Sequence, residues 1–435
     1  MDDITLLARA LRTLDDKLSN CNRCGLCQSV CPVYGETLLE GDVARGKLAL
    51  VNNLSHELLA DPEAVRDRLG RCLLCGACHD VCPAGVNTFE LFLAAREIIH
   101  GYLGLSPLKK ALFRTLLPNA RLLNLLLSAG LPFRKLVMRE EHNAQDTTQA
   151  PLLRKFAGDR HLPSMPGKTL SAMTGAINSP AGKSRIKVAF FPGCMGNMVY
   201  TDMARACLKV FDYHEVGVFF PQDFVCCGLP ALTSGEVDGF RKSVMHNVDV
   251  FKSGTFDYIV TPCPSCTMTI RDMWVQRAAS LPFAYRDAIN ELSAKAIDIN
   301  AFLIDVVGVR KPQLRNRGRK IIKATFHDPC HLRLSLGITS QPRELIRMNP
   351  QYRLAEMEEA GRCCGCGGTF TLNEPELSAR IGERKVRNIL ASQAEVVATG
   401  CPACMMQISD MLARRGSKVI VRHAIEIYAE ALERR

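Results

Sequence analysis

Two adjacent cysteines followed by a glycine occur twice, in "FVCCGLP" (residues 224–230) and in "GRCCGCGG" (residues 361–368). Neighbouring Cα atoms are about 3.8 Å apart. This is closer than the roughly 4.4–6.8 Å that a disulfide prefers. The two pairs therefore indicate that both sulfurs bind something other than each other.

Each pair belongs to a set of five cysteines, and the second set lies 136 to 138 residues after the first. A nearly constant offset predicts an internal duplication. Five thiolates exceed what one cubane cluster or one zinc ion needs, and adjacent thiolates can bind different irons of one opened cluster. The alternative is plain burial of cysteine in a core. The predicted metal ligands are Cys194, Cys226, Cys227, Cys263 and Cys266 in the first set and Cys330, Cys363, Cys364, Cys401 and Cys404 in the second.

Short apolar runs lead into these cysteines, as in "KVAFFPGC" (residues 187–194) and "DYIVTPC" (residues 257–263), and helical patterns such as "TDMARACLKVFDYH" (residues 201–214) follow. Alternating strands and helices predict an α/β layer with a mostly parallel sheet in each copy. The cysteines then lie at the carboxyl ends of strands, where such sheets bind ligands and where helix N-termini favour anionic sulfur.

Four further residues lie in or near the duplicated region. Cys207 falls inside a helical pattern and is expected in the core, whereas Cys366 is either a spare ligand or an accident. His327 and His331 flank a cysteine in "HDPCHL", where they either donate to sulfur, serve proton transfer or cap a loop.

Nearer the N-terminus, "CNRCGLCQSVCP" (residues 21–32) and "CLLCGACHDVCP" (residues 72–83) share one cysteine spacing. It is typical of two-cluster bacterial ferredoxins, in which the fourth cysteine of each run ligates the other cluster. Four-cysteine zinc sites use paired CxxC units instead. Arg45, between the runs, either holds a cluster edge by charge or lies in a surface turn. The predicted ligands of two cubane 4Fe-4S clusters are Cys21, Cys24, Cys27 and Cys82 for cluster 1 and Cys72, Cys75, Cys78 and Cys31 for cluster 2.

The cysteine content also bears on the compartment. The chain has 20 cysteines among 435 residues, and its first 20 residues are acidic and amphipathic, without the features of a signal peptide. A cytoplasmic location is therefore expected, where cysteines at fixed spacings are metal ligands rather than disulfides.

The formal net charge is +11, yet no basic stretch is interleaved with aromatic residues, so nucleic-acid binding is not expected. No apolar run is long enough to span a membrane. Residues 107–137 are apolar with basic flanks, and they either form a helix pair that covers the cluster domain or lie on the inner face of the cytoplasmic membrane.

These patterns predict a multidomain α+β protein. A helical two-cluster ferredoxin domain (residues 1–137) and a linker rich in Pro, Gly, Ser and Thr (residues 138–186) precede the two copies (residues 187–318 and 319–435). Two P-loop-like sequences in the linker lack the first glycine, so no bound nucleotide is expected.

The duplicated sets resemble the CCG domain of heterodisulfide reductase, in its B-type chain, whose motifs hold noncubane 4Fe-4S clusters. A two-cubane domain ahead of two such motifs is similar to the D-type chain of methanogen heterodisulfide reductase. It is equally similar to the iron-sulfur subunits of glycolate oxidase, bacterial lactate dehydrogenases and anaerobic glycerol-3-phosphate dehydrogenase. Both intact Cys-Pro-x-Cys ends favour the reductases, and "GDVARGK" (residues 41–47) and "HLP" (residues 161–163) favour the hydroxyacid enzymes.

The resemblance implies the iron-sulfur subunit of an oxidoreductase complex. A separate FAD-containing subunit would oxidise lactate or glycolate, and this chain would pass the electrons to a quinone or another carrier through two cubane clusters and one or two further clusters. A second hypothesis makes the CCG clusters catalytic in cleaving a disulfide, and a third is a structural module that stores clusters.

Overall fold

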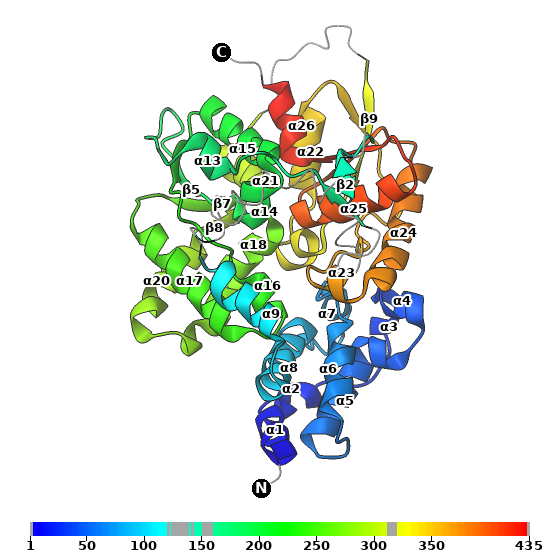
Figure 1. Cartoon of the computed structure of the whole chain (residues 1–435). Helices are drawn as coiled ribbons and strands as arrows, with labels where there is room; N and C mark the ends of the chain where they lie inside the picture. Colours follow the sequence, from blue (N-terminus) through cyan, green and yellow to red (C-terminus); the bar gives the residue numbers. More distant parts are fainter. Residues whose placement is uncertain are drawn as a thin grey trace.

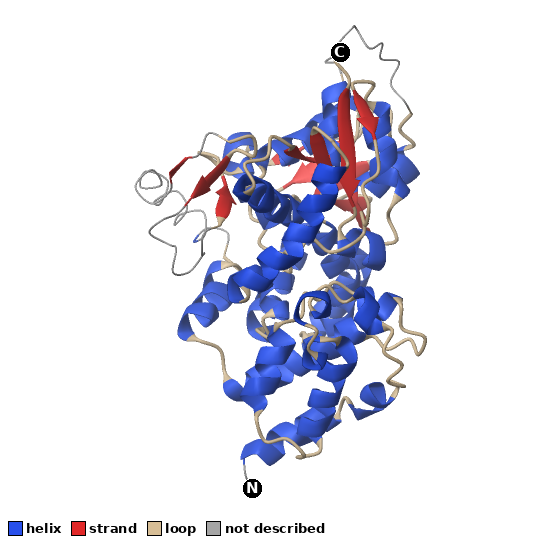
Figure 2. Cartoon of the chain, turned by 90° about the vertical axis from the view of Figure 1, so that its right-hand side faces the viewer, coloured by secondary structure: helices blue, strands red, loops and turns tan. Residues whose placement is uncertain are grey.

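Three groups of elements follow one another along the chain in the computed structural model, which describes residues 3–119, 122, 139–140, 143–149, 160–310 and 320–432. The N-terminal helices form one end of the molecule, and two α/β units lie side by side on them (Figure 1). Figure 2 shows the strands gathered at the opposite end from the N-terminus. The predicted α+β class with mostly parallel sheets is confirmed.

The N-terminal group is entirely helical within the described residues, because its cysteine loops alternate with short amphipathic segments. Asn87 caps the longest helix of this group, and its side chain accepts a hydrogen bond from the Glu90 amide at 3.1 Å. The elements are α1 (Asp3–Arg12), α2 (Asp15–Ser19), α3 (Cys27–Val30), α4 (Tyr34–Thr37), η1 (Glu40–Asp42), α5 (Ala44–Ser55), α6 (Pro62–Gly70), α7 (Ala77–Asp80), α8 (Thr88–Leu103), α9 (Pro107–Ala111) and the π-helix η2 (Leu112–Leu116).

The first α/β unit has a sheet whose order among the described residues is β4-β6-β5-β7-β8, and all neighbours are parallel except β4 and β6. Its three central strands β5, β6 and β7 are almost fully buried, as expected of a parallel sheet covered on both faces. The elements are β4 (Ile177–Asn178), β5 (Lys187–Phe190), α14 (Gly193–Met198), α15 (Thr201–Tyr213), β6 (Gly217–Phe220), α16 (Leu229–Thr233), α17 (Val237–Lys252), β7 (Tyr258–Thr261), α18 (Pro264–Met268), η5 (Thr269–Met273), α19 (Trp274–Arg277), η6 (Ala278–Ser280), α20 (Phe283–Ala294), β8 (Ala296–Asp298), α21 (Ile299–Ala301) and η7 (Phe302–Val307).

The second unit repeats this topology with the order β10-β9-β11-β12, and all its neighbours are parallel. The central strands β5 and β9 correspond, as do β7 and β11, so the duplication seen in the cysteine spacing extends to the fold. The elements are β9 (Ile322–His327), η8 (His331–Ser335), α22 (Ser340–Met348), β10 (Tyr352–Leu354), α23 (Phe370–Asn373), α24 (Pro375–Ala391), β11 (Val396–Thr399), α25 (Pro402–Arg414), β12 (Ile420–His423) and α26 (Ala424–Ala431).

The two units share their cores. Helix α26, at the end of the second unit, packs against α15 of the first (Figure 1). Ile425 and Tyr428 of α26 belong to the same buried cluster as Phe190 and Phe211 of the first unit. The Tyr428 hydroxyl is also hydrogen-bonded to His214 at 2.8 Å. The first copy is therefore completed by the last helix of the chain.

The segment 138–186, predicted as a linker, contains regular elements in its described part. Strands β1 (Arg139–Glu140), β2 (Thr147–Gln149) and β3 (His161–Pro163) form an antiparallel sheet beside α25. A short helix, α13 (Leu170–Thr174), and strand β4 follow, and β4 joins the first α/β sheet. Short backbone pairings of this kind leave no hydrophobic periodicity, which is why the composition indicated a linker. The domain boundaries themselves stay a prediction.

The apolar segment 107–137 is described through residue 119 and at residue 122. This part packs on α17 of the first α/β unit, where Arg114 lies 2.5 Å from Glu236. Phe113 is buried in a hydrophobic cluster that also contains Leu91 and Ile99 of the cluster domain. Residues 120–121 and 123–137 lie outside the described part of the chain. No helix among the described residues has the length and apolar character needed to span a bilayer.

A buried ion pair attaches the segment before β3 to the second copy. Arg160 lies 3.0 Å from Asp410 and donates to Gln407 at 2.6 Å, and both ionic side chains are at most 5 % exposed. Asp410 also binds the more exposed Arg414 at 2.8 Å.

We expect Arg160→Met to lower the free energy of unfolding by about 2–3 kcal/mol, because it leaves the buried Gln407 oxygen without its donor and removes the buried positive charge beside Asp410. Arg414→Met, which removes the exposed partner of the same carboxylate, should cost no more than about 1 kcal/mol. Chemical denaturation followed by circular dichroism measures both. Equal losses in the two variants would contradict the structural role given to Arg160.

Candidate metal centres

The four cysteines predicted for cluster 1 line one cavity beneath α5. Cys21 and Cys24 come from the loop before α3, Cys27 is the first residue of α3, and Cys82 comes from the loop after α7. Arg45 lines the same cavity, so it lies against this cysteine set rather than in an isolated turn. Its positive charge lowers the pKa of Cys27, although burial has the larger effect and raises it.

The four cysteines predicted for cluster 2 line a second cavity, where Cys31 joins Cys72, Cys75 and Cys78. Each cavity therefore brings three cysteines of one run together with the last cysteine of the other run, as the crossed ligation pattern of two-cluster ferredoxins requires, and Cys78 additionally lines the first cavity. Cys78 lines both cavities, so the two sets are adjacent.

Backbone amides and a hydroxyl point at these sulfurs. The amides of Tyr34 and Leu74 lie 3.5 Å from the Sγ atoms of Cys31 and Cys72. The hydroxyl of Thr88 lies 3.0 Å from the Sγ of Cys78. Such donors stabilise thiolates and the sulfur-rich groups that thiolates bind. The donor set thus fits 4Fe-4S clusters.

In each α/β unit the five predicted cysteines lie past the carboxyl ends of the parallel strands. Cys226 is hydrogen-bonded to Cys194 and Cys227, and Cys227 is hydrogen-bonded to Cys266. These bonds hold the pKa of Cys227 well below its usual range, although burial opposes them. The first set therefore forms a connected group in which the thiolate is favoured at one of the adjacent pair.

The second set is connected in the same way. A hydrogen bond from Cys363 lowers the pKa of Cys330 to about 6. Hydrogen bonds from Cys363 and Cys404 hold the pKa of Cys364 well below its usual range. Thiolates are the form that binds metals, so both sets have the chemistry of a metal site.

The sets of the two copies meet each other. Cys263 of the first set is hydrogen-bonded to Cys401 of the second. The pKa of Cys263 lies well below its usual range, first because of its hydrogen bond with Cys266 and second because of this bond with Cys401. The ten cysteines therefore form one series across the boundary between the copies.

The N-terminal domain approaches the second copy at Cys75. Burial first, and then the negative charge of Cys330, raise the pKa of Cys75 well above its usual range. Cys75 also shares a buried cluster with Phe370 and Leu377 of the second copy. The cluster 2 set is thus adjacent to the second CCG set.

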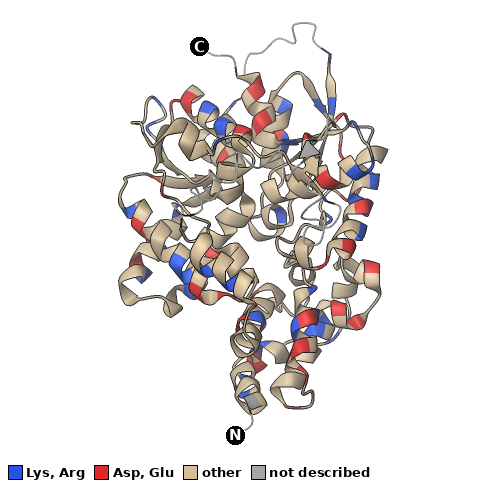
Figure 3. Ribbon diagram, in the orientation of Figure 1, with Lys and Arg blue, Asp and Glu red and all other residues tan. Residues whose placement is uncertain are grey.

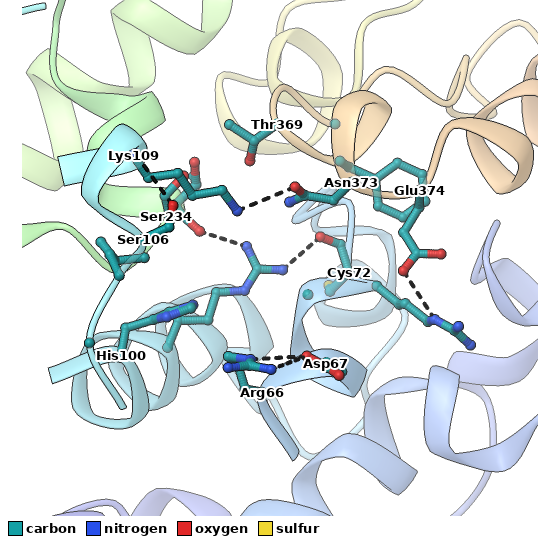
Figure 4. A pocket seen from close by; sticks show the side chains of 18 residues that line it. Arg66, Asp67, Cys72, His100, Ser106, Lys109, Ser234, Thr369, Asn373 and Glu374 are labelled. Atoms are coloured by element: carbon teal, nitrogen blue, oxygen red, sulfur yellow. Dashed lines mark hydrogen bonds and ion pairs between the residues drawn. The ribbon is translucent and has the colours of Figure 1, made fainter. Parts of the chain in front are cut away.

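Polar contacts hold this junction in place around a cavity (Figure 4). Arg71 lies 3.3 Å from Glu374 of the second copy, and Lys109 donates to Asn373 at 3.4 Å. Arg96 donates to the Thr233 carbonyl of the first copy at 2.9 Å. The N-terminal domain is therefore attached to both copies beside the cysteines.

The two predicted histidines have different environments. The Nε2–H of His331 donates to the Leu74 carbonyl at 3.1 Å, and its Nδ1 accepts from the Ser265 hydroxyl at 2.9 Å. Both nitrogens are thus engaged away from sulfur, and His331 joins the N-terminal domain to the two copies. His327 instead lies against Cys364 and Cys404.

Two buried lysines lie beside the cysteines, and neither was predicted from the sequence as a site residue. Lys47 lies beside Cys31 and Cys72, and Lys385 lies beside the second CCG set. Burial lowers the pKa of Lys385 to about 8, while neighbouring thiolates oppose that shift. Neither lysine forms an ion pair with a carboxylate among the residues that the structure describes, so the thiolates are their available counter-charges. One feature of the sequence does indicate burial of Lys385, because this residue falls on the apolar stripe of α24 between Ile381 and Ile389.

The two cysteines outside the sets differ in location. Cys207 is fully buried in the core of the first unit, as expected. Cys366 is buried near Cys364 and Cys330, whose negative charges add to the effect of burial in raising its pKa to about 12. Its role as a spare ligand therefore stays a prediction.

Family models match both parts of this arrangement. A 4Fe-4S dicluster domain matches residues 17–86, and a cysteine-rich domain named CCG matches residues 188–271 and 324–409. Fold and matches together define an iron-sulfur electron-transfer protein with a dicluster domain and a duplicated cysteine-rich domain.

Relatives of known name cover the chain to different extents. The "Probable glycolate oxidase iron-sulfur subunit" of Bacillus subtilis is 27% identical, over 96% of this chain and 94% of its own. Lactate utilization protein A of Exiguobacterium sp. is 30% identical over 57% of this chain and 98% of its own. The D-type chain of the dihydromethanophenazine:CoB–CoM heterodisulfide reductase of Methanosarcina barkeri is 25% identical over 96% of this chain and 94% of its own. The chain belongs to the CCG-domain family of iron-sulfur subunits of the glycolate oxidase and lactate utilization type.

The glycine after each cysteine pair is required by the backbone. Gly365 has φ +91°, and a Cβ there would lie 2.7 Å from the Ser378 carbonyl oxygen. Gly368 also has positive φ, but a Cβ would meet nothing within 4 Å.

We expect Gly365→Ala to lower the free energy of unfolding by about 2–4 kcal/mol, from backbone strain plus overpacking, and to lower the iron content. Gly368→Ala should cost only about 1 kcal/mol and leave the iron content unchanged. Iron analysis of anaerobically purified protein, with thermal unfolding, measures both. An unchanged iron content in Gly365→Ala would contradict a metal site built on this turn.

Lys385→Met should shift the reduction potential of the second CCG site to more negative values, because it removes a positive charge that stabilises added electrons. Coulomb's law at an effective dielectric constant of about 20 gives an effect on the order of 2 kcal/mol, or tens of millivolts. Arg384→Met, on the exposed side of α24, is the control, and a potentiometric titration followed by EPR measures both. A shift of equal size in both variants would show that Lys385 has no special role.

Proposed function

We propose that this chain transfers single electrons from an FAD-containing subunit that oxidises a 2-hydroxy acid, lactate or glycolate, to a quinone or another carrier. The observation that carries the proposal is the continuity of the cysteine sets. Cys78 joins the two ferredoxin-type sets, Cys75 approaches Cys330, and Cys263 contacts Cys401. Bound 4Fe-4S clusters would supply one-electron chemistry at each set.

The proposed ligands are the cysteines of the two ferredoxin-type runs together with those of the duplicated sets. In the N-terminal domain, Cys21, Cys24, Cys27 and Cys82 hold one cubane cluster, and Cys72, Cys75, Cys78 and Cys31 hold the other. Each CCG set holds one further cluster. The protein's own contribution is ligation, burial and charge, which set the reduction potential.

The names of the relatives support the choice of substrate class. Glycolate oxidase and lactate utilization appear in those names, and neither a flavin nor a nicotinamide fingerprint is visible in the sequence. We therefore infer that substrate oxidation takes place on a partner protein. Basic and acidic residues alternate along the ribbon in Figure 3 without a separate basic region, which favours a protein partner over nucleic acid.

A second candidate function is cleavage of a disulfide at the CCG sets. Both five-cysteine sets are intact, and a cavity at Cys194 and Cys226 is lined by the polar side chains of Ser171, Asn197 and Gln222. A sulfur-containing substrate could approach the first set there. A heterodisulfide reductase chain is among the relatives.

The deciding experiment is anaerobic purification of the full chain from its host together with its partners. D-lactate, L-lactate, glycolate, glycerol-3-phosphate and a thiol pair are then added in turn while the cluster absorbance is followed. We expect one hydroxy acid to bleach the absorbance in a complex that contains flavin. Cys75→Ser should lower the bleached amplitude, whereas Cys207→Ser, which changes a core cysteine outside the sets, should not.

Bleaching by the thiol pair alone would replace electron transfer with the disulfide chemistry of the second candidate. In that case Cys404→Ala should abolish disulfide turnover and leave reduction of the cubane clusters intact. Flavin-containing complexes in which no hydroxy acid bleaches the clusters would contradict the proposal.

A further inference from the structure

His327, the last residue of β9, has one nitrogen engaged and one free. Its side chain is fully buried, and Nδ1 lies 3.1 Å from the Ala360 carbonyl oxygen. A carbonyl oxygen only accepts hydrogen bonds, so Nδ1 carries the hydrogen. In the neutral ring this leaves the lone pair on Nε2.

That lone pair is directed toward sulfur. Apart from the sulfur of Cys364, which it faces, Nε2 of His327 has no hydrogen-bond partner within the described part of the chain. It forms a group with the Sγ atoms of Cys364 and Cys404 in which all ligand atoms lie within 4.8 Å of one another. All three residues are buried. Three buried electron-pair donors facing each other are costly unless protons or a metal cation lie between them.

The backbone contact of His327 is the kind that metal-binding histidines make. A ligating histidine usually donates its other ring N–H to a carbonyl or carboxylate, which fixes the tautomer and the ring orientation. Ala360 supplies this acceptor, and the same carbonyl also accepts from the Asp328 amide and from Lys385, both at 3.1 Å. The imidazole is therefore held in one orientation before any metal binds.

The first copy lacks this group. Phe191 lies three residues before Cys194, as His327 lies three residues before Cys330. The ring of Phe191 packs against those of Phe224 and Phe251, and it offers no ligand atom. The two CCG sets, which are alike in their cysteines, thus differ in their donor chemistry.

We propose that Nε2 of His327 is a ligand of the iron centre held by the second CCG set, which therefore has mixed nitrogen and sulfur ligation, while the first set is ligated by sulfur alone. The inference rests on the proposed iron-sulfur cluster at the second set. Imidazole and thiolate both suit iron. A neutral imidazole adds a ligand atom without adding negative charge to the five thiolates, and histidine is an established ligand of iron in iron-sulfur proteins.

The test is pulsed EPR on the full chain, purified anaerobically after labelling with ¹⁵N-histidine and then reduced. We expect a ¹⁵N hyperfine coupling to the second-set signal in the unsubstituted protein. His327→Phe, which copies the first set, should abolish the coupling. His331→Gln should retain it, because both nitrogens of His331 already have protein partners. His327→Cys keeps a ligand atom at this position, so it should retain iron and lose the ¹⁵N coupling. This variant tests the proposal even if His327→Phe does not fold.

Two results would overturn the proposal, and Cys364→Ser distinguishes them. If Cys364→Ser removes a cluster signal that shows no ¹⁵N coupling in the unsubstituted protein, His327 only contacts the site, and the electron-transfer proposal stands. If Cys364→Ser changes neither the iron content nor the spectrum, the second set holds no cluster. The proposed cofactor at that set then fails together with its histidine ligand.

Discussion

The main constraint on this structure is that negatively charged thiolates have to be kept in the protein interior. A buried charge is costly unless donors or opposite charges surround it, and each cysteine set has such partners. Amides of Tyr34 and Leu74 point at sulfurs in the N-terminal domain, and the lysines Lys47 and Lys385 supply positive charge. The parallel sheets serve the same need, because the carboxyl ends of their strands lead into helix N-termini. The fold and the ligand chemistry thus meet the same requirement, which is to surround buried thiolates with positive charge and hydrogen-bond donors.

The duplication extends to the topology but not to all of the chemistry. Both copies share the central strand order and the five-cysteine spacing. The second copy has His327 and Lys385 beside its cysteines. At the corresponding places the first copy has Phe191 and Asn247, and Asn247 binds the backbone of Val225 and Cys226 instead. Two sites with the same primary ligands therefore have different surroundings, and the more positive surroundings belong to the second set, which lies beside Cys75 of the N-terminal domain.

The sequence predicted the parts of the protein that have a strict period. Cysteine spacing indicated both kinds of cysteine set, and apolar runs indicated the parallel strands. Residues 160–186 were missed because strands of two or three residues have no period, and their pairing is decided by distant partners such as Asp410. Lys385 was missed because a lysine normally extends into solvent, and only the contact between α24 and the cysteine loop shows otherwise. His327 was recognised as a candidate, but its free nitrogen depends on the Ala360 carbonyl, 33 residues away.

The position of α26 determines the order in which the two copies can finish folding. Because Ile425 and Tyr428 complete the core of the first copy, that copy lacks part of its interior until α26 has been synthesised. Domains otherwise tend to fold during synthesis from the N-terminus onward. The first set of five cysteines is therefore held in its final arrangement only after the second copy has been made, although its own strands come first in the chain.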